Sequence, residues 1–354
     1  EDHVVLDESL VIRASRLTLH DDLSVADGTT PDLAIHADFA YDGHLGAGNP
    51  LNSFLLNGMG ELGGRVTTIE HQTYRGSLGL LDDLLLESTD AGRIRIDAPL
   101  DGASALDIDT AGITRLDRSV GAVERLTALR SDEPGLTLLG ADVKSDVVDF
   151  GDRVRLLGSQ RVAGDSVRFG GGINGAGNSL TVRATDTRLD GDVDAMDVLR
   201  TDAAGTTTIA ADVTGRRLLF GDDVLLESDS VLTARELVNV DGTLDGAYDL
   251  VVNSGNRARF GDDVGGAEKL ASLTTHIRKL LQFEGETVHA HGDIKLNPKG
   301  LGTPGIVATI AGLGEGRATS QSITSYTGDV IVGRGEKLSI VGDAVISAMQ
   351  GRIR

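Results

Sequence analysis

Short runs in which every second residue is apolar recur along the chain. Examples are residues 179–183 (SLTVR), 207–211 (TTIAA) and 248–252 (YDLVV), each close to Gly, Asp, Asn or Thr. Alternation with a period of two predicts β-strands that bury one face. A strand of this kind is not stable alone, so the pattern predicts many short strands that pack on one another.

The strand pattern returns at a constant interval. Leu84, Val154, Val224 and Ile294 are equally spaced, and each is followed two positions later by leucine. The tripeptide Phe-Gly-Asp at residues 150–152 returns at residues 220–222. A motif of Arg, then Ser or Thr, then Asp and a later Gly occupies residues 130–135 and again residues 200–205. Several matching landmarks in three or four copies indicate an internal repeat rather than chance similarity.

A repeat made only of short strands predicts a β-solenoid. Landmarks inside one repeat lie roughly 18 to 24 residues apart, which is the usual length of one coil of a parallel β-helix. A repeat of ~70 residues would therefore hold about three coils, and the whole chain about 15. We predict an all-β fold, a right-handed parallel β-helix in which successive coils pair at ~4.8 Å.

The repeats divide this expected solenoid into three sections of one continuous elongated domain. Residues 1–79 are expected to form degenerate coils, residues 80–295 the repeat-bearing coils (repeats near 80–149, 150–219 and 220–290), and residues 296–354 Gly-rich coils or a cap. Residues 267–281 have some helical spacing, but the repeat register assigns them to strands. Residues 297–300 read as a tight turn, and residues 300–318 as a looser coil or a loop.

Composition strengthens the case for a turn-rich β fold. The 354 residues include 47 Gly but only 6 Pro, and aromatic residues make up 3%. Of the 54 acidic residues 14 are Glu, which leaves 40 Asp. Aspartate favours turns because its short carboxylate bonds nearby backbone N–H groups, whereas Glu suits helices better. The scarcity of aromatic rings fits a narrow core of Val, Leu and Ile.

Charge and cysteine content exclude several classes of function. The net charge of −21 disfavours binding to nucleic acid and to anionic membrane surfaces, because phosphate groups would be repelled. The absence of Cys excludes disulfides and thiolate metal sites. No run approaches 18 apolar residues, so membrane insertion is not expected. The chain starts at Glu1 without Met or a signal peptide, which suits a processed product or an excerpt of a longer protein.

Three tracts resemble the repeats of filamentous-haemagglutinin-like bacterial surface adhesins. They are residues 179–182 (SLTV), 199–209 (LRTDAAGTTTI) and 269–275 (KLASLTT), within a similarity that covers roughly residues 80–295. The resemblance lies in composition and in the order of residues within short tracts, and it includes no catalytic or ligand-binding motif. It implies a right-handed parallel β-helix, export across the envelope and an adhesive or scaffolding role. Nothing in the chain resembles that family's N-terminal secretion domain.

Paired acids are the most obvious candidates for catalysis. The pairs are Asp82–Asp83, Asp222–Asp223 and Asp262–Asp263. Two carboxylates could act as acid and base in glycoside cleavage, but adjacent residues of a strand point to opposite faces. The pairs also recur with the repeat, whereas an active site is expected once, so turn capping is the preferred interpretation. The β-helical pectin-degrading enzymes also use a Gly-His-Gly motif and a basic cluster, which residues 42–46 (DGHLG) and 276–279 (HIRK) match poorly.

Some of these residue types are common metal ligands, and they suggest two candidate metal sites. Stacked Asp columns could hold calcium, although residues 170–175 (GGGING) only loosely resemble a Gly-rich calcium repeat. His289 and His291 lie on one face of a strand and could bind zinc with Glu286 or Asp293. Solvated side chains and diffuse screening of the acidic surface are the preferred interpretation. We therefore assign no catalytic, cofactor-binding or metal-binding residue, while calcium stays open. Residues 312–316 lack the Lys-Ser/Thr end of a phosphate loop.

The pattern as a whole favours a non-enzymatic, extracellular structural or adhesive protein. Strand edges at the ends of a solenoid invite head-to-tail association, so the expected partner is another copy of the chain, in a surface fibre, sheath or filament. Cell-surface glycans are a further candidate partner. The alternative is a polysaccharide lyase or glycoside hydrolase on the same fold. A third interpretation, a carbohydrate- or receptor-binding adhesin tip, is weakened by the scarcity of Trp and Tyr.

Overall fold

The chain forms a parallel β-solenoid of about 15 turns. The computed structural model describes residues 4–132, 134–296, 307–311, 321–325, 327, 330–332, 337–341 and 344–354. In these ranges every regular element is a strand, and none is a helix that could cross a membrane. The prediction of an all-β parallel solenoid is confirmed, whereas its handedness stays a prediction.

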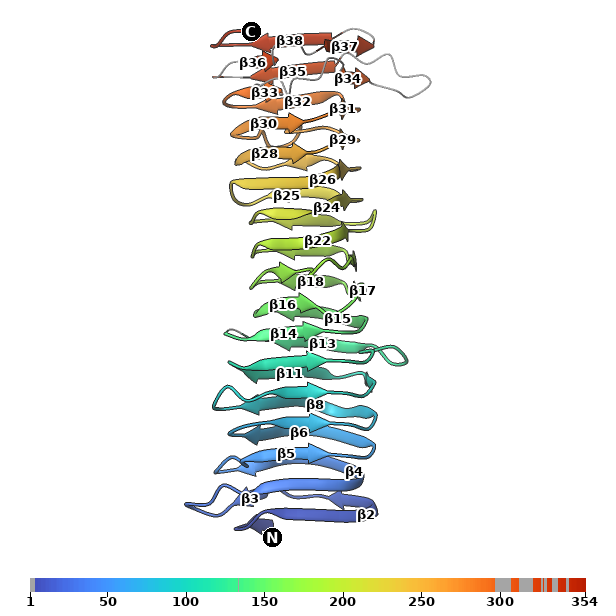
Figure 1. The fold of residues 1–354 in the computed structure, drawn as a ribbon, viewed down its shortest axis with the longest axis vertical. Coiled ribbons are helices and arrows are strands. Elements are labelled where there is room, and N and C mark those ends of the chain that lie inside the picture. Colours follow the sequence, from blue (N-terminus) through green and yellow to red (C-terminus); the bar gives the residue numbers. More distant parts are fainter. Residues whose placement is uncertain are drawn as a thin grey trace. The chain divides into compact units, whose positions relative to one another are not determined.

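The chain divides into two compact units, Glu1–Asn174 and Gly175–Arg354. Figure 1 labels strands of both units. The predicted section boundary between residues 79 and 80 lies inside one strand of the first unit, β8. The strands of the first unit are β1 (Val4–Leu6), β2 (Leu10–Leu19), β3 (Leu23–Val25), β4 (Asp32–Ala47), β5 (Ser53–Leu56), β6 (Gly60–Thr68), β7 (Gln72–Tyr74), β8 (Leu78–Ser88), β9 (Ile94–Ile96), β10 (Leu100–Asp101), β11 (Ala105–Thr110), β12 (Ile113–Leu116), β13 (Leu126–Ser131), β14 (Leu136–Leu139), β15 (Val143–Phe150), β16 (Arg153–Leu156), β17 (Gln160–Ala163), β18 (Ser166–Phe169) and β19 (Ile173–Asn174).

The second unit is built in the same way from parallel pairs. Its strands are β20 (Leu180–Arg183), β21 (Asp186–Leu189), β22 (Val193–Arg200), β23 (Thr206–Ile209), β24 (Val213–Phe220), β25 (Asp223–Leu226), β26 (Ser230–Val240), β27 (Leu244–Asp245), β28 (Asp249–Ser254), β29 (Arg257–Phe260), β30 (Ser272–Ile277), β31 (Leu280–Phe283), β32 (Thr287–Ala290), β33 (Ile294–Leu296), β34 (Val307–Ala311), β35 (Gln321–Ser325), β36 (Val330–Val332), β37 (Lys337–Val341) and β38 (Ala344–Ala348).

Each turn of the first unit crosses three faces. The first face contains the start of β2 and of β4, followed by β5, β7, β9, β12, β14, β16 and β19. The second face contains the end of β2, the middle of β4, the starts of β6 and β8, β10, the start of β15 and β17. The third face contains β1, β3, the ends of β4, β6 and β8, then β11, β13, the end of β15 and β18. Long strands such as β4 therefore bend at corners and serve more than one face.

The core consists of apolar side chains that stack from turn to turn. On the first face one such column runs through seven successive turns, and each member is at most 1% exposed. Stacking of apolar side chains lets each turn bury the apolar face of the next, so a mostly aliphatic core also accommodates the few aromatic rings of the chain. The members of this column are Ile35, Leu56, Tyr74, Ile96, Leu116, Leu139 and Leu156.

The length of a turn varies along this column. The chain between Leu139 and Leu156 is shorter than the chain between Leu116 and Leu139, although each segment makes one full turn. Leu84 lies in β8 on the third face, whereas Val154, its counterpart in the next repeat, lies in β16 on the first face. The repeat interval therefore does not return to the same face within the first unit, and the prediction of three whole coils per repeat is not confirmed.

Residues 267–281, which have some helical spacing, are not helical. They contain β30, which pairs with β28, and the start of β31, which pairs with β29. Phe260 and Phe283 stack with ring centroids 5.1 Å apart, so the paired strands also share a buried aromatic contact. The assignment of this stretch to strands is confirmed. The predicted turn at residues 297–300 lies outside the described residues, as does the predicted loop at 300–318 apart from β34.

Gly205, one of the repeat landmarks, occupies a position that only glycine tolerates. Its φ is +95°, and a Cβ there would overlap the carbonyl oxygen of Thr185 in the preceding turn. We expect Gly205→Ala to lower the free energy of unfolding by about 1–3 kcal/mol, because it adds both backbone strain and overlap. Urea denaturation followed by circular dichroism measures this change.

Gly79 provides the matched control for this prediction. Its φ is not in the left-handed region, and a Cβ there would meet only the carbonyl oxygen of Gly60, at 3.7 Å. Gly79→Ala should therefore leave the unfolding midpoint nearly unchanged. Equal midpoints for the two alanine variants would contradict the assignment of Gly205 as a required glycine.

Candidate functional site

The candidate acid pairs lie at corners, within β8 for Asp82–Asp83, at the start of β25 for the second pair and after β29 for the third, and each pair holds a neighbouring turn. The Oδ1 atom of Asp83 accepts a hydrogen bond from the backbone N–H of Ala105 at 2.8 Å. The Oδ1 atom of Asp223 accepts one from Thr243 at 2.8 Å. In the third pair, Asp263 accepts from the N–H of residues 286 and 287 at 2.6 and 2.8 Å. These carboxylates serve the backbone, as the turn-capping interpretation predicted.

The same contact occurs at many other corners of both units, and we call it an aspartate clamp. In a clamp, an Asp Oδ1 accepts a backbone N–H that follows 19 to 24 residues later, in the next turn. A charged acceptor makes a stronger hydrogen bond than a neutral one, and the bond satisfies an N–H that leaves the ladder at a corner. Further clamps are made by Asp22, Asp38, Asp101, Asp142, Asp192, Asp212, Asp229 and Asp245.

Two corners carry a buried variant of this arrangement. Asp152 is 2% exposed, and its carboxylate accepts hydrogen bonds from Ser131 Oγ at 2.5 Å and Thr137 Oγ1 at 3.0 Å. In the second unit, Asp222 is 3% exposed and accepts from Thr201 Oγ1 at 2.6 Å and Thr207 Oγ1 at 2.7 Å. Each residue of the second set follows its counterpart in the first by the repeat interval. The repeat therefore preserves a buried polar corner, a role that the spacing alone did not reveal.

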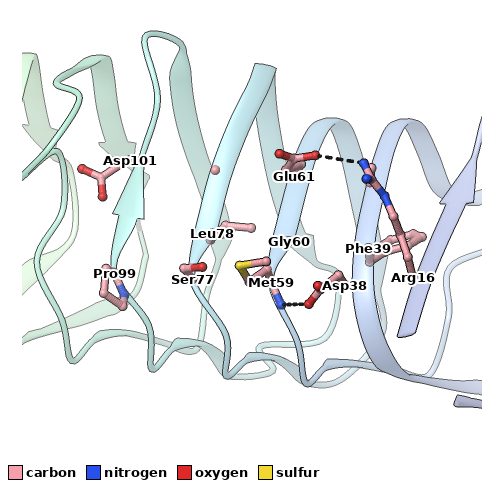
Figure 2. A pocket seen from close by; sticks show the side chains of 12 residues that line it. Arg16, Asp38, Phe39, Met59, Gly60, Glu61, Ser77, Leu78, Pro99 and Asp101 are labelled. Atoms are coloured by element: carbon pink, nitrogen blue, oxygen red, sulfur yellow. Dashed lines mark hydrogen bonds and ion pairs between the residues drawn. The ribbon is translucent and has the colours of Figure 1, made fainter. Parts of the chain in front are cut away.

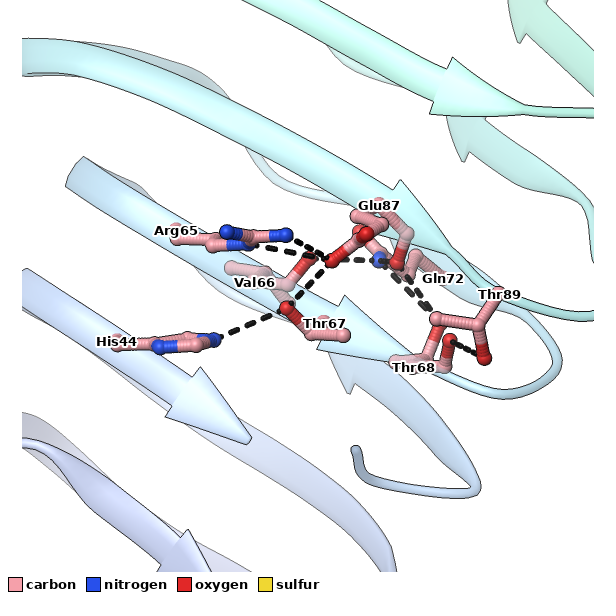
Figure 3. Close-up of polar contacts among 8 residues, drawn as sticks. All are labelled: His44, Arg65, Val66, Thr67, Thr68, Gln72, Glu87 and Thr89. Carbon is pink, nitrogen blue, oxygen red and sulfur yellow. Dashed lines mark hydrogen bonds and ion pairs between the residues drawn. The ribbon is translucent and has the colours of Figure 1, made fainter. Parts of the chain in front are cut away.

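A polar cluster of the first unit surrounds Thr67 on the third face (Figure 3). Its Oγ1 donates to Glu87 Oε2 at 3.0 Å and lies 3.0 Å from His44 Nε2. Arg65 Nη2 lies 2.5 Å from the same Glu87 oxygen. Burial and the nearby Arg65 charge lower the pKa of His44, so its imidazole is neutral at pH 7. Although His44 belongs to the weak Gly-His-Gly candidate, it does not act as the acceptor of the Thr67 proton, which goes to Glu87.

A fully buried glutamine continues this cluster into the core. Gln72 Nε2 donates to the carbonyl oxygens of Val66 at 3.1 Å and Glu87 at 2.7 Å, and Gln72 Oε1 accepts from Tyr74 Oη at 2.8 Å. Each polar end of the side chain therefore has a partner, as a buried amide requires. The cluster links β4, β6, β7 and β8, and its chemistry is that of a structural network. A single polar residue at an inward position of β7 was the only signal in the sequence.

Two pairs of stacked aspartates have perturbed ionisation. Burial and a hydrogen bond with Asp117 raise the pKa of Asp97. The pKa of Asp117 is lowered: burial opposes the change, but hydrogen bonds from Asp97 and Arg115 outweigh it. Burial and the neighbouring charge of Asp132 likewise raise the pKa of Asp109, which hydrogen-bonds to Asp132. Carboxyl groups that hydrogen-bond to each other are closer than the ≈ 5–5.5 Å separation of retaining glycosidases, so neither pair has that spacing.

The residues considered as zinc ligands do not converge among the described residues. Burial, followed by the charge of Lys269, lowers the pKa of His289 at the end of β32. Asp293 Oδ2 lies 2.7 Å from Lys295 Nζ, and the N–H of Glu286 donates to Asp263. Across the described ranges, no three His, Asp or Glu side chains are grouped so as to hold a metal ion. His276 of the basic cluster lies in β30 of the second unit, and His44 in β4 of the first.

A hollow on the second face of the first unit is a different kind of site (Figure 2). Its volume is about 310 Å³, and it extends from β2 across the next turns to β10. Glu61, Gly79 and Asp101 are register partners on its outer surface, so the glycine leaves a gap between two acids. Arg16 Nη2 lies 3.9 Å from Glu61 Oε2, and both side chains are largely exposed. No motif or spacing in the sequence indicates this hollow.

Comparisons with protein families, with curated proteins and with solved structures find no match for the chain.

Removing one clamp should loosen the turn that it holds. We expect Asp83→Ala and Asp245→Ala each to accelerate amide hydrogen exchange about fivefold, at Ala105 and at Ala267 respectively, because each loses a hydrogen bond worth about 1 kcal/mol. Asp186→Ala, at an exposed position in β21, is the control. If hydrogen exchange at Ala105 and Ala267 rose equally in all three variants, the clamps would have no local role.

Ionisation of Asp222 should make stability depend on pH. Burial raises the pKa of Asp222 above its unfolded value, although Thr201 and Thr207 oppose the change. The folded state therefore binds its proton more tightly, so this stabilisation is present at low pH and is lost as pH rises through the folded pKa. Relative to Asp222→Asn, the natural protein should gain stability as pH falls from 7 towards 4.

Urea denaturation at several pH values measures this difference. Asp186→Asn removes an exposed carboxylate and should leave the slope against pH unchanged. A difference between the natural protein and Asp222→Asn that stays constant with pH would contradict the assignment to Asp222.

Proposed function

We propose that the chain is a non-enzymatic structural or adhesive protein that acts outside the cell, on a bacterial surface. The observation that carries this proposal is the use of the conspicuous acids: the second member of each predicted pair is a clamp between turns. Clamps recur in both units, so the acidic residues that resemble catalytic groups maintain a regular scaffold. A scaffold of this kind offers surface and stiffness, which are the properties of a fibre or adhesin subunit.

The resemblance to filamentous-haemagglutinin-like adhesins supports the same proposal. Those proteins are surface-exposed repeat proteins, and a parallel β-solenoid is the fold that the resemblance implies. Cell-surface glycans are a second partner that fits an adhesive role. The scarcity of aromatic residues favours polar and apolar contacts along the surface over stacking on sugar rings.

Self-association is the interaction that we propose for the scaffold. β1 pairs with β3 and β2 pairs with β4, so each has an edge that can accept a further parallel strand. Val5 and Val11 on these strands are 55% and 53% exposed, which is unusual beside the buried columns of later turns. A second copy that adds its own strands there would continue the ladders and cover apolar surface, giving a filament.

Electron microscopy of the purified chain over a range of concentrations tests the proposal. We expect elongated particles that join end to end as concentration rises. Val5→Lys combined with Val11→Lys should prevent joining, whereas Thr208→Lys, on the outer side of β23, should not. Particles that never associate would remove the filament from the proposal.

A polysaccharide lyase or hydrolase on the same fold is the alternative function. The raised pKa of Asp109 beside Asp132 is the observation that favours it, since a general acid needs a pKa above the ordinary value of a carboxyl group. We expect acidic and neutral glycans to remain intact when they are incubated with the chain. Size-exclusion chromatography measures their length. Depolymerisation that Asp109→Asn or Asp132→Asn abolishes would overturn the non-enzymatic proposal.

A further inference from the structure

The hollow on the second face of the first unit combines acidic groups with apolar surface. Its carboxylates are Asp38, Glu61 and Asp101, against the single cation of Arg16, which gives a net charge of −2. Met59, which is exposed, and Leu78 contribute apolar atoms to the lining. A flexible cationic side chain with an apolar stem suits this combination, because its stem packs on apolar atoms while its head contacts carboxylates.

The chain itself shows which cation reaches this hollow. Arg16 belongs to β2 and Glu61 to β6, two turns further along the second face, with β4 between them. Figure 2 shows the Arg16 side chain extending past the β4 turn towards Glu61. The separation of 3.9 Å and the exposure of the two side chains, 70% and 58%, make this a loose contact. An exposed ion pair of this kind contributes little and is readily exchanged for another partner.

The floor of the hollow is open at Gly79. A Cβ at that position would meet only the carbonyl oxygen of Gly60, at 3.7 Å. The register partners of Gly79 are Glu61 in the preceding turn and Asp101 in the next, so a side chain entering here lies between two carboxylates. Asp101 uses its Oδ1 in a clamp with the N–H of residues 123 and 124, which fixes the carboxylate in place.

We propose that this hollow binds an arginine side chain of a partner protein, which displaces Arg16 from Glu61. A planar guanidinium donates paired hydrogen bonds to carboxylates, which an ammonium group cannot do in the same geometry. The net charge of −21 attracts basic partners over longer distances. The inference goes beyond the proposed scaffold, which stands whether or not the hollow is occupied.

The methionines provide a direct readout in the full chain. The protein has three, of which Met59 lines the hollow, Met196 is buried in the second unit and Met349 is exposed there. With ¹³C-methyl methionine, titration with acetyl-arginine-amide should shift the Met59 resonance in a saturable manner and leave the other two unchanged. Acetyl-citrulline-amide, the neutral isostere, should produce no shift.

Three variants separate the proposed contacts. Glu61→Gln should weaken binding about tenfold, since it removes the charge-assisted contact. Gly79→Leu should abolish binding by filling the floor. Arg16→Ala should strengthen binding because it removes the internal competitor. An unchanged far-ultraviolet circular dichroism spectrum of each variant reports an intact fold.

A variant that removes one carboxylate elsewhere tests whether the arginine probe binds to the acidic surface in general. Glu227→Gln removes a carboxylate that pairs with Arg188 at 2.7 Å in the second unit, and it should leave the Met59 titration unchanged. The proposal is overturned if Met59 does not respond to the arginine probe, if citrulline shifts it equally, or if Arg16→Ala weakens binding. None of these outcomes bears on filament formation.

Discussion

The structure depends on how the backbone is satisfied where strands end at corners. Within a face, N–H and C=O groups pair between parallel strands, but at many corners a strand ends and this ladder is interrupted. Aspartate resolves the problem because its carboxylate is short enough to stay at the corner and charged enough to bond strongly with an N–H of the next turn. Asp outnumbers Glu by 40 to 14, and the clamps account for part of this excess.

Much of the fold could be predicted because solenoid structure is local. Alternation over four or five residues identifies strands such as β20, β23 and β28, and Gly and Asp mark their ends. The competing helical spacing of residues 267–281 was resolved by the repeat register alone. The number of coils per repeat was harder to predict, because loops of different length follow similar strands. Sequence spacing therefore does not reveal which face a strand joins.

The candidate sites show the limits of sequence more clearly. The acid pairs could be recognised and their capping role inferred, but the hydroxyl partners of Asp152 and Asp222 lie 15 and 21 residues earlier in the chain. The cluster around Thr67 and the hollow beside Glu61 arise only when successive turns are stacked in register. Such sites bring together residues that are a whole turn apart in the chain, and neither residue type nor local spacing distinguishes them from the many other Asp, Arg and Thr residues.

The change of face between Leu84 and Val154 has a consequence for how such a chain grows. The same short sequence pattern, apolar at alternate positions and followed by a corner, lies on the third face at Leu84 and on the first face at Val154. A duplicated gene segment therefore need not encode a whole number of windings to be accommodated. Lineages of this architecture are free to lengthen by fractional increments, so that sequence periodicity and winding number diverge during evolution.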